Sequence, residues 1–355
     1  DFMVQHEAAA CLSVRMHSAR TVRAECCNNE GKRSHHVADG LTFLLRSGAE
    51  YRDIFPVWDW QKLPGTTCLQ TAEPEAAQTV WSRGLATTVG GVGDGRHGAC
   101  MQHLLNAHLE ARKSWFFGPA GMVCLGAGIR GRSPGPVVTA LDQSLLQGVV
   151  ESPAAAELPR GSHVLRGARW LRHGPWGFVF PDPVDVSVEL GPKTGAWNLI
   201  APGPGGAVTR DVFLACLHHG DTPRDGSYAY LVTTGADRPA LERIAHHPVY
   251  QIAANSKACQ AVWWPEASLL QAAFFQPGEI AWGDGGLLHA DRACCVQLRR
   301  DDAGAWVPDV ADVQQQGGVI GIGFRDGRPA AVKESAVPVP AGDHAGQTVR
   351  ATWRS

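Results

Sequence analysis

The chain has 355 residues, enough to bury more than one hydrophobic core, so two domains are a better expectation than one. Its 32 Lys and Arg residues nearly balance 34 Asp and Glu residues, and the net charge of -2 excludes an overall basic field that would hold nucleic acid or an anionic membrane surface. No stretch of the sequence reaches the roughly 18 apolar residues that a membrane-spanning helix needs.

Glycine and proline punctuate the sequence, with 41 and 23 residues, and amphipathic runs of helical length are scarce. Both features favour short strands joined by turns, and therefore an all-β fold. Apolar residues alternate with polar ones as one buried sheet face requires, along residues 11–16, 177–180, 184–190 and 228–232. These runs predict a large antiparallel β-sandwich over residues 1–265, with a short connecting helix at 238–245.

The composition changes after about residue 267, where short apolar runs alternate with charged turns. The runs are residues 271–275, 293–298 and 319–324. This spacing predicts a smaller C-terminal β-sandwich over residues 266–355.

The 10 cysteines form no Cys-x-x-Cys pair and no Cys/His pattern of a zinc site. Several of them lie inside apolar runs, as Cys124 and Cys216 do, where a thiol behaves as a small hydrophobic group. We therefore expect buried free thiols in preference to disulfides, and neither a metal nor a cofactor.

Three segments carry a resemblance to a known family. The second, residues 51–67, is the most specific, because it contains Trp58-Asp59-Trp60 and closes on Pro-Gly-Thr-Thr. The first runs over residues 13–40 and includes Glu25-Cys26-Cys27-Asn28, and the third runs over residues 89–129. With weaker matches up to about residue 260, these motifs make the chain resemble polysaccharide lyase family 8, which includes hyaluronate, chondroitin AC and xanthan lyases.

The resemblance implies a galactose mutarotase-like supersandwich followed by a small C-terminal β-domain, both preceded by an N-terminal α/α toroid. It also implies an acidic polysaccharide in the cleft between toroid and sandwich, and a secreted, extracellular enzyme. Because the chain begins almost directly on a sandwich strand, we expect the toroid to be missing from it and this chain alone to be inactive. We further expect a monomer, without nucleic acid or membrane partners.

The resemblance implies β-elimination from a 4-linked uronic acid. Removing the C5 proton requires that the adjacent carboxylate be neutralised and that a base and an acid be present. In similar enzymes the main base and acid belong to the toroid, and the chemistry needs no metal.

Glu25 and Asn28 match the Glu-x-x-Asn spacing by which the family's sandwich contributes to the opposite wall of the cleft. The resemblance implies supporting catalytic roles: the carboxylate holds an arginine of the toroid, and the amide binds the substrate. An exposed polar pair in a turn is the alternative. The loop departs from the family pattern after Asn29, where a second Asn and aromatic residues are replaced.

Four further residues are candidate substrate contacts. The guanidinium groups of Arg20 and Arg23 suit carboxylate or sulfate, and an unperturbed imidazole at His36 would titrate near neutrality and contact an anionic sugar. Asn29 lies in the same loop as Asn28. Solvated side chains are the alternative for the two arginines and the histidine. At the level of function, the alternative to a lyase is a non-catalytic carbohydrate-binding β-sandwich.

Overall fold

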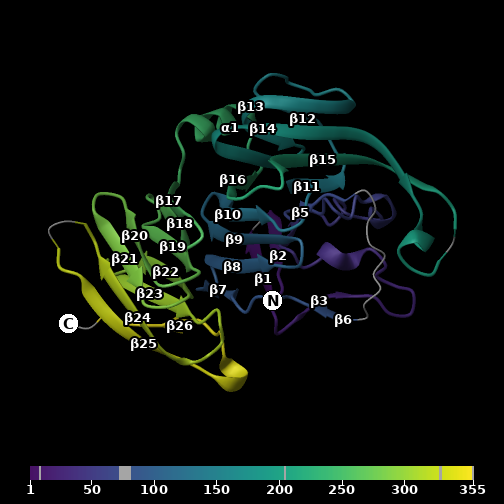
Figure 1. Cartoon of the computed structure of the whole chain (residues 1–355). Helices are drawn as coiled ribbons and strands as arrows, with labels where there is room; N and C mark the ends of the chain where they lie inside the picture. The colour runs from purple at the N-terminus through teal and green to yellow at the C-terminus, as the bar shows by residue number, and fades with distance from the viewer. Residues whose placement is uncertain (8, 72–80, 204, 328–329, 354–355) are drawn as a thin grey trace.

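The computed structural model describes residues 1–7, 9–71, 81–203, 205–327 and 330–353. Over these residues antiparallel strands form five sheets, and the large sheets pack face to face in layers (Figure 1). The all-β fold predicted from composition and alternation is confirmed.

An 11-stranded sheet is the centre of the N-terminal part, in the order β5-β11-β15-β14-β16-β10-β9-β8-β7, with β13 attached to β14 and β12 to β13. Its strands are β5 (Thr67–Leu69), β7 (Val89–Gly93), β8 (Gly98–Leu105), β9 (Leu109–Gly118), β10 (Gly121–Gly131), β11 (Pro136–Leu145), β12 (Val150–Glu151), β13 (Gly161–His173), β14 (Trp176–Gly195), β15 (Val208–Asp221) and β16 (Gly226–Thr234). The smaller sheets are β1 (Phe2–Glu7), β2 (Ala10–Arg15) and β4 (Leu41–Leu45), and the pair β3 (Val22–Glu25) and β6 (Trp81–Arg83).

The C-terminal part contains a six-stranded and a four-stranded sheet. The first consists of β17 (Gln251–Asn255), β18 (Cys259–Trp264), β19 (Leu269–Phe274), β22 (Cys294–Arg300), β23 (Trp306–Ala311) and β26 (Val349–Arg350), and the second of β20 (Gly278–Trp282), β21 (Gly286–Ala290), β24 (Gly318–Arg325) and β25 (Lys333–Val339). The helices are α1 (Arg238–His246) and the 3-10 turns η1 (Ser34–His36), η2 (Phe55–Val57), η3 (Trp197–Leu199) and η4 (Gly342–His344). None of the helices described is long and apolar enough to cross a membrane.

The expected helix at 238–245 is confirmed as α1, which begins after Asp237, whose carboxylate accepts a hydrogen bond from Ala240 N. The expectation of buried free thiols is also confirmed. All 10 cysteines are free, and seven of them are buried, including Cys124 and Cys216.

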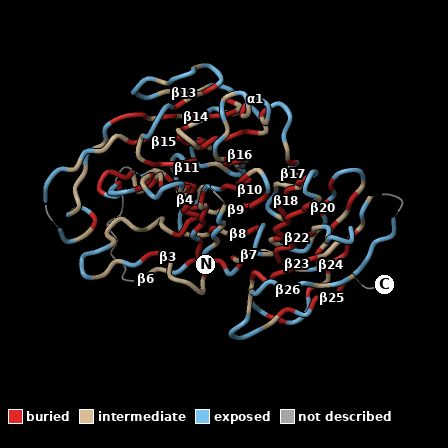
Figure 2. The backbone as a smooth tube through the Cα atoms, turned by 180° about the vertical axis from the view of Figure 1, so that it is seen from behind, coloured by how far each residue is buried: buried red, intermediate tan, exposed pale blue. Residues whose placement is uncertain are grey.

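The central strands of the 11-stranded sheet, such as β9 and β10, are buried on both faces, which explains apolar runs that do not alternate. Along β10, Met122 and Cys124 pack in one core with Leu12 of β2, while Val123 packs on the other side in a core that includes Val262 of β18. Successive side chains point to opposite faces of a strand, so a strand between two layers needs apolar residues at every position. Figure 2 shows the buried residues concentrated in the layered sheets, with the outer turns exposed.

Residues 177–180 and 184–190 were predicted as two strands but form one, β14. Pro181 and Pro183 lie between the two runs, and neither can donate a backbone hydrogen bond. The register with β13 shifts around Ala168, opposite this segment, so the ladder is interrupted while the extended backbone continues.

The division of the chain at residue 265 stays a prediction. β17 and β18 precede that residue, yet they belong to the same six-stranded sheet as β19, which follows it. The stretch between α1 and β17 is the short link between the 11-stranded and the six-stranded sheets.

The contact between the two parts includes a buried amide. Gln271 Nε2 donates to Gly98 O at 2.8 Å and to Phe117 O at 3.0 Å, while its Oε1 accepts from Trp264 Nε1 at 3.0 Å. A buried amide whose groups are all bonded specifies one arrangement, because any displacement would leave polar atoms without partners.

Gly118 allows the close approach of Trp264 at this contact. A Cβ at residue 118 would lie 2.2 Å from Trp264 Cε2, and the tryptophan is itself buried. We therefore expect Gly118→Ala to lower the free energy of unfolding by about 1–3 kcal/mol, measured by urea unfolding. Gly206→Ala is the control, because a Cβ there meets no atom within 4 Å. Equal midpoints for both variants would contradict this packing.

Candidate functional site

Glu25 and Asn28 lie on one exposed loop, residues 25–33, which we call the Glu25 loop. Glu25 is the last residue of β3, and the backbone then turns through left-handed conformations at Asn28 (φ 49°), Asn29 (φ 63°) and Gly31 (φ 66°). Asn tolerates this region better than most residues, and Gly tolerates it without strain. The sequence of the loop thus permits a tight turn that exposes Glu25, Asn28 and Asn29.

Backbone contacts hold the Glu25 loop. Glu30 N donates to Cys27 O at 2.7 Å, and Ser34 Oγ donates to Glu25 O at 3.2 Å. A Cβ at residue 31 would lie 2.3 Å from Glu25 O, so only glycine fits there. Near the end of the loop, Lys32 contacts the segment between β14 and β15. Its backbone N donates to Ile200 O at 3.2 Å, and its Nζ donates to Asn198 O at 3.4 Å. The loop therefore rests against the tip of the β14–β15 hairpin.

A buried carboxylate, Asp39, anchors both ends of the segment that carries the loop. Arg23 binds it through two bonds, from Nε to Oδ1 at 2.8 Å and from Nη2 to Oδ2 at 2.7 Å. His36 Nδ1 lies 2.8 Å from Oδ2, and its Nε2 lies 3.2 Å from the sulfur of Cys68. His17 Nε2 lies 3.0 Å from Oδ1. Arg23 precedes the loop and His36 follows it, so Asp39 joins its two ends.

The charges in this network depend on one another. Burial alone would favour the neutral acid, but the Arg23 guanidinium and the imidazoles of His17 and His36 hold the pKa of Asp39 well below its usual range. Burial opposes the charged form of His36 too, but the Cys68 sulfur and the Asp39 carboxylate outweigh it and raise the pKa of His36 to about 10. The network is therefore an ion cluster at neutral pH.

Lys113 lies below this cluster, fully buried, on the same strand face as Trp115. Its Nζ donates to Gly65 O at 2.6 Å and to Asp39 O at 3.0 Å. Burial is the main cause that lowers the pKa of Lys113, to about 7. The lysine thus bonds the backbone of Asp39 from the core side.

His36 and Lys113 give opposite pH dependences. The pKa of His36 is raised, so its contribution to stability is full below about pH 6.5 and is lost as the pH rises towards 10. The pKa of Lys113 is lowered, so the folded protein carries an unfavourable buried charge at low pH. That charge is lost as the pH rises past about 7, and the free energy of unfolding increases from there to about pH 10.5. We expect urea midpoints of Lys113→Met to fall relative to wild type over about pH 7–10, and those of His36→Asn to rise. Parallel curves for the three proteins would contradict these assignments.

The six residues predicted from the sequence do not form one cluster. Glu25, Asn28 and Asn29 are exposed together on the Glu25 loop, and Arg23 and His36 lie in the Asp39 cluster behind it. Arg20 lies apart and donates to the backbone carbonyls of residues 87, 89, 313 and 314, where the N-terminal and C-terminal parts meet. Substrate binding by Arg20, Arg23 and His36 stays a prediction, and their observed partners are internal.

Asp39 and Lys113 were missed as site residues. A signal was present for Lys113, because it stands two and four residues before Trp115 and Phe117 and therefore on the same strand face as these bulky residues. The two tryptophans of the family motif lie in the core: Trp58 is buried and Trp60 packs partly buried beside it, with ring centroids 5.5 Å apart. Within the described residues, no group of three His, Cys, Asp or Glu side chains is placed to hold a metal ion.

The sequence of the chain matches two domain models of a known family. Residues 1–245 match the model of the polysaccharide lyase family 8 super-sandwich domain, and residues 251–319 match the model of that family's C-terminal beta-sandwich domain. The chain belongs to polysaccharide lyase family 8. The resemblance found in the motifs of residues 13–129 is therefore confirmed.

Two curated lyases align over nearly the whole chain. Chondroitinase-AC of Pedobacter heparinus is 32% identical over 352 residues, which cover 98% of this chain and 50% of that protein. A hyaluronate lyase of Thermasporomyces composti is also 32% identical, over 95% of this chain and 44% of its own length. The chain thus spans about half the length of these relatives.

Solved structures agree with the sequence comparison. A chondroitinase AC lyase solved in complexes with oligosaccharides superimposes with a TM-score of 0.94 at 30% identity, over 99% of this chain and 52% of that one. The Streptomyces coelicolor chondroitin AC lyase in complex with chondroitin sulphate gives a TM-score of 0.83 at 29% identity, over 98% of this chain and 48% of that one. The similarity extends over both β-domains.

Proposed function

We propose that this chain forms the sandwich wall of a secreted polysaccharide lyase that cleaves uronic-acid-containing glycans, of the hyaluronan or chondroitin type, by β-elimination. The observation that carries the proposal is the exposed pair Glu25 and Asn28, held on a braced loop of a family 8 sandwich. The α/α toroid that the family resemblance implies would form the opposite wall of the cleft. We also propose that the enzyme acts outside the cell as a monomer.

Each of the two side chains suits one part of the chemistry. The amide of Asn28 donates to the substrate carboxylate, whose charge grows as the C5 proton leaves. The carboxylate of Glu25 accepts hydrogen bonds from an arginine of the toroid and so orients it towards the same group. Neither residue has to move the proton.

The tyrosines of this chain are unsuited to that proton transfer. The chain contains 4 Tyr, and Tyr51, Tyr228, Tyr230 and Tyr250 are all buried. Burial raises the pKa of each phenol, as at Tyr228, well above its usual value. We therefore assign the main base and acid to the toroid.

The test compares the chain alone with a protein in which a family toroid precedes residue 1. Hyaluronan, chondroitin and xanthan are the substrates, and ultraviolet absorbance of the unsaturated product is the signal. We expect no elimination by the chain alone and measurable elimination by the longer protein. Elimination by the chain alone would contradict the assignment of the base and acid, and inactivity of a folded longer protein on all three glycans would contradict the proposed reaction.

The second candidate function is non-catalytic binding of an acidic glycan, favoured by the burial of all four tyrosines. Saturable binding of hyaluronan or chondroitin by an inactive longer protein would support it over the lyase.

A further inference from the structure

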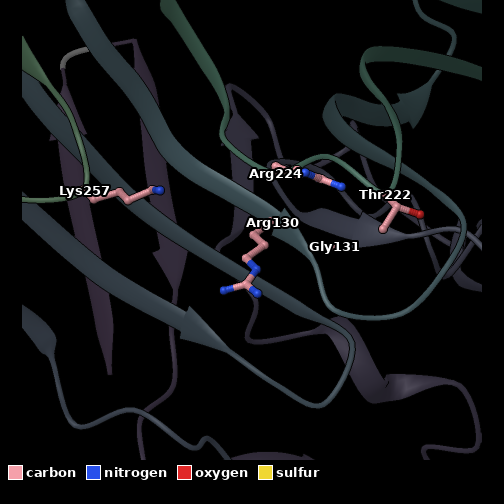
Figure 3. A pocket seen from close by; sticks show the side chains of 5 residues that line it. All are labelled: Arg130, Gly131, Thr222, Arg224 and Lys257. Carbon is pink, nitrogen blue, oxygen red and sulfur yellow. The ribbon is translucent and has the colours of Figure 1, made fainter.

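A basic pocket lies where the end of β10 meets two turns (Figure 3). It has a volume of about 450 Å³ and is lined by Arg130, Gly131, Thr222, Arg224 and Lys257. Residues 130 and 131 end β10, residues 222 and 224 form the β15–β16 turn, and Lys257 belongs to the β17–β18 turn. Both β-domains therefore contribute to the pocket.

A bulge in β10 directs Arg130 outwards. The register with β9 shifts between Ala127 and Arg130, and the register with β16 shifts between Gly126 and Ile129. Gly128, inside the bulge, has a left-handed φ of 61°. After the shift Ile129 is fully buried and Arg130 is exposed. Such bulges redirect side chains at binding sites.

Packing fixes the other walls of the pocket. A Cβ at Gly128 would lie 2.5 Å from Lys257 Cγ, so the aliphatic part of the lysine crosses the bulge where glycine leaves room. Gly131 N donates to Pro223 O at 2.8 Å, which holds the β15–β16 turn against β10. The turn that carries Arg224 is thus hydrogen-bonded to β10, and the side chain of Lys257 packs on the bulge of the same strand.

The charges of the pocket are only partly balanced. Lys257 Nζ pairs with Asp225 Oδ1 at 2.9 Å. Arg130 and Arg224 are exposed and have no ion-pair partner within the described part of the chain. Two unpaired guanidinium groups offer forks of donors that match the planar oxygens of a carboxylate or the oxygens of a sulfate.

We propose that this pocket is a second glycan-binding site, which holds an oxyanion group, carboxylate or sulfate ester, of an acidic polysaccharide outside the cleft that the Glu25 loop faces. The choice of glycan as the ligand rests on the proposed function. The Glu25 loop contacts the tip of the β14–β15 hairpin, and the pocket lies at the opposite end of β15, a strand of 14 residues. A strand of that length spans roughly 40 Å, so one sugar unit cannot occupy both sites.

The test measures binding of fluorescently labelled oligosaccharides to the 355-residue protein by polarisation, and therefore needs no turnover. The probes are a chondroitin sulfate and an unsulfated hyaluronan oligosaccharide of equal length, with inorganic sulfate as competitor. The test variant is Arg130→Ala/Arg224→Ala. The matched control is Arg96→Ala/Arg243→Ala, which removes the same charge from two other exposed arginines.

We expect the test variant to bind about tenfold more weakly at low salt, since two exposed charge-assisted contacts are lost, and the control to stay within about twofold of wild type. Weaker binding of both probes by the test variant assigns the pocket to carboxylate, and weaker binding of the sulfated probe alone assigns it to sulfate ester. Equal losses in both double variants, or no saturable binding of either probe by wild type, would overturn the proposal. Glu25→Gln should retain this binding, so a failure of the proposed elimination reaction would leave the result intact.

Discussion

Replacing Asp39 with alanine is expected to lower the free energy of unfolding by about 3–5 kcal/mol, more than the loss expected for Gly118→Ala. The carboxylate is fully buried, and its removal leaves Arg23 without its bidentate partner and His36 without its Nδ1 contact. Uncompensated charge in a buried position is the physical reason for the loss. Urea unfolding monitored by tryptophan fluorescence measures it.

An exposed ion pair provides the control for Asp39. Asp326, which pairs with Arg300 at 2.8 Å, is 45% exposed, and Asp326→Ala should lower the free energy of unfolding by no more than about 1 kcal/mol.

Replacing Asp39 with asparagine tests the pH dependence of the cluster. Because the pKa of Asp39 is held well below its usual value, its contribution is complete above about pH 4 and is lost as the pH falls. The Asn variant should therefore show a weaker acid dependence. A wild-type acid profile in that variant would show that Asp39 is not the anion of the cluster.

In the longer protein that carries the toroid, Asn28→Gly and Glu25→Gln are each expected to reduce kcat by roughly 100-fold. Under the proposed function, loss of the Asn28 amide would remove a donor to the developing charge, and loss of the Glu25 charge would release the toroid arginine that it is proposed to orient. Glycine is preferable to alanine at residue 28, because the left-handed φ of 49° would strain alanine and confuse misfolding with lost chemistry. Initial rates of unsaturated product formation give kcat and KM.

Glu30→Gln is the matched control for these variants, since it removes a carboxylate from the same exposed loop outside the Glu-x-x-Asn spacing. We expect its kcat to stay within about twofold of wild type, because an exposed charge away from the reacting group contributes little. Wild-type kcat in both Asn28→Gly and Glu25→Gln would remove these residues from the site. A loss in all three variants would point instead to a general effect of loop charge or conformation.

The fold could be predicted in outline because its signals are local. Alternation predicted the strands β2 and β16, and a proline near the start of an amphipathic run predicted α1. The joining of two predicted strands into β14 was missed, because the backbone stays extended through Pro181 and Pro183 despite the hydrogen bonds they cannot donate. Whether a strand ends at a proline depends on its neighbours in the sheet, which alternation does not report.

The site was predictable to a smaller extent. Glu25 and Asn28 were found through a motif, and both proved exposed on one loop. The partner of Arg23 was not found, because Asp39 lies 16 residues further on and is brought to it only by the fold. Arg20 resembled a free cation in the sequence, yet its guanidinium donates to carbonyls more than 60 residues away.

The sequence by itself determined that this protein is all-β, rich in free thiols, and a relative of the family 8 polysaccharide lyases, since these properties depend on composition, alternation and motifs of neighbouring residues. Only the tertiary structure decided which charged side chains are exposed to solvent and which are paired or hydrogen-bonded inside the protein. Arg23, Arg130 and Lys113 look alike as cations in the sequence, but one is paired with Asp39, one faces solvent at a bulge and one is buried. The reason is that the free energy of a charge depends on its burial and its partners, and both are set by segments far apart in the chain.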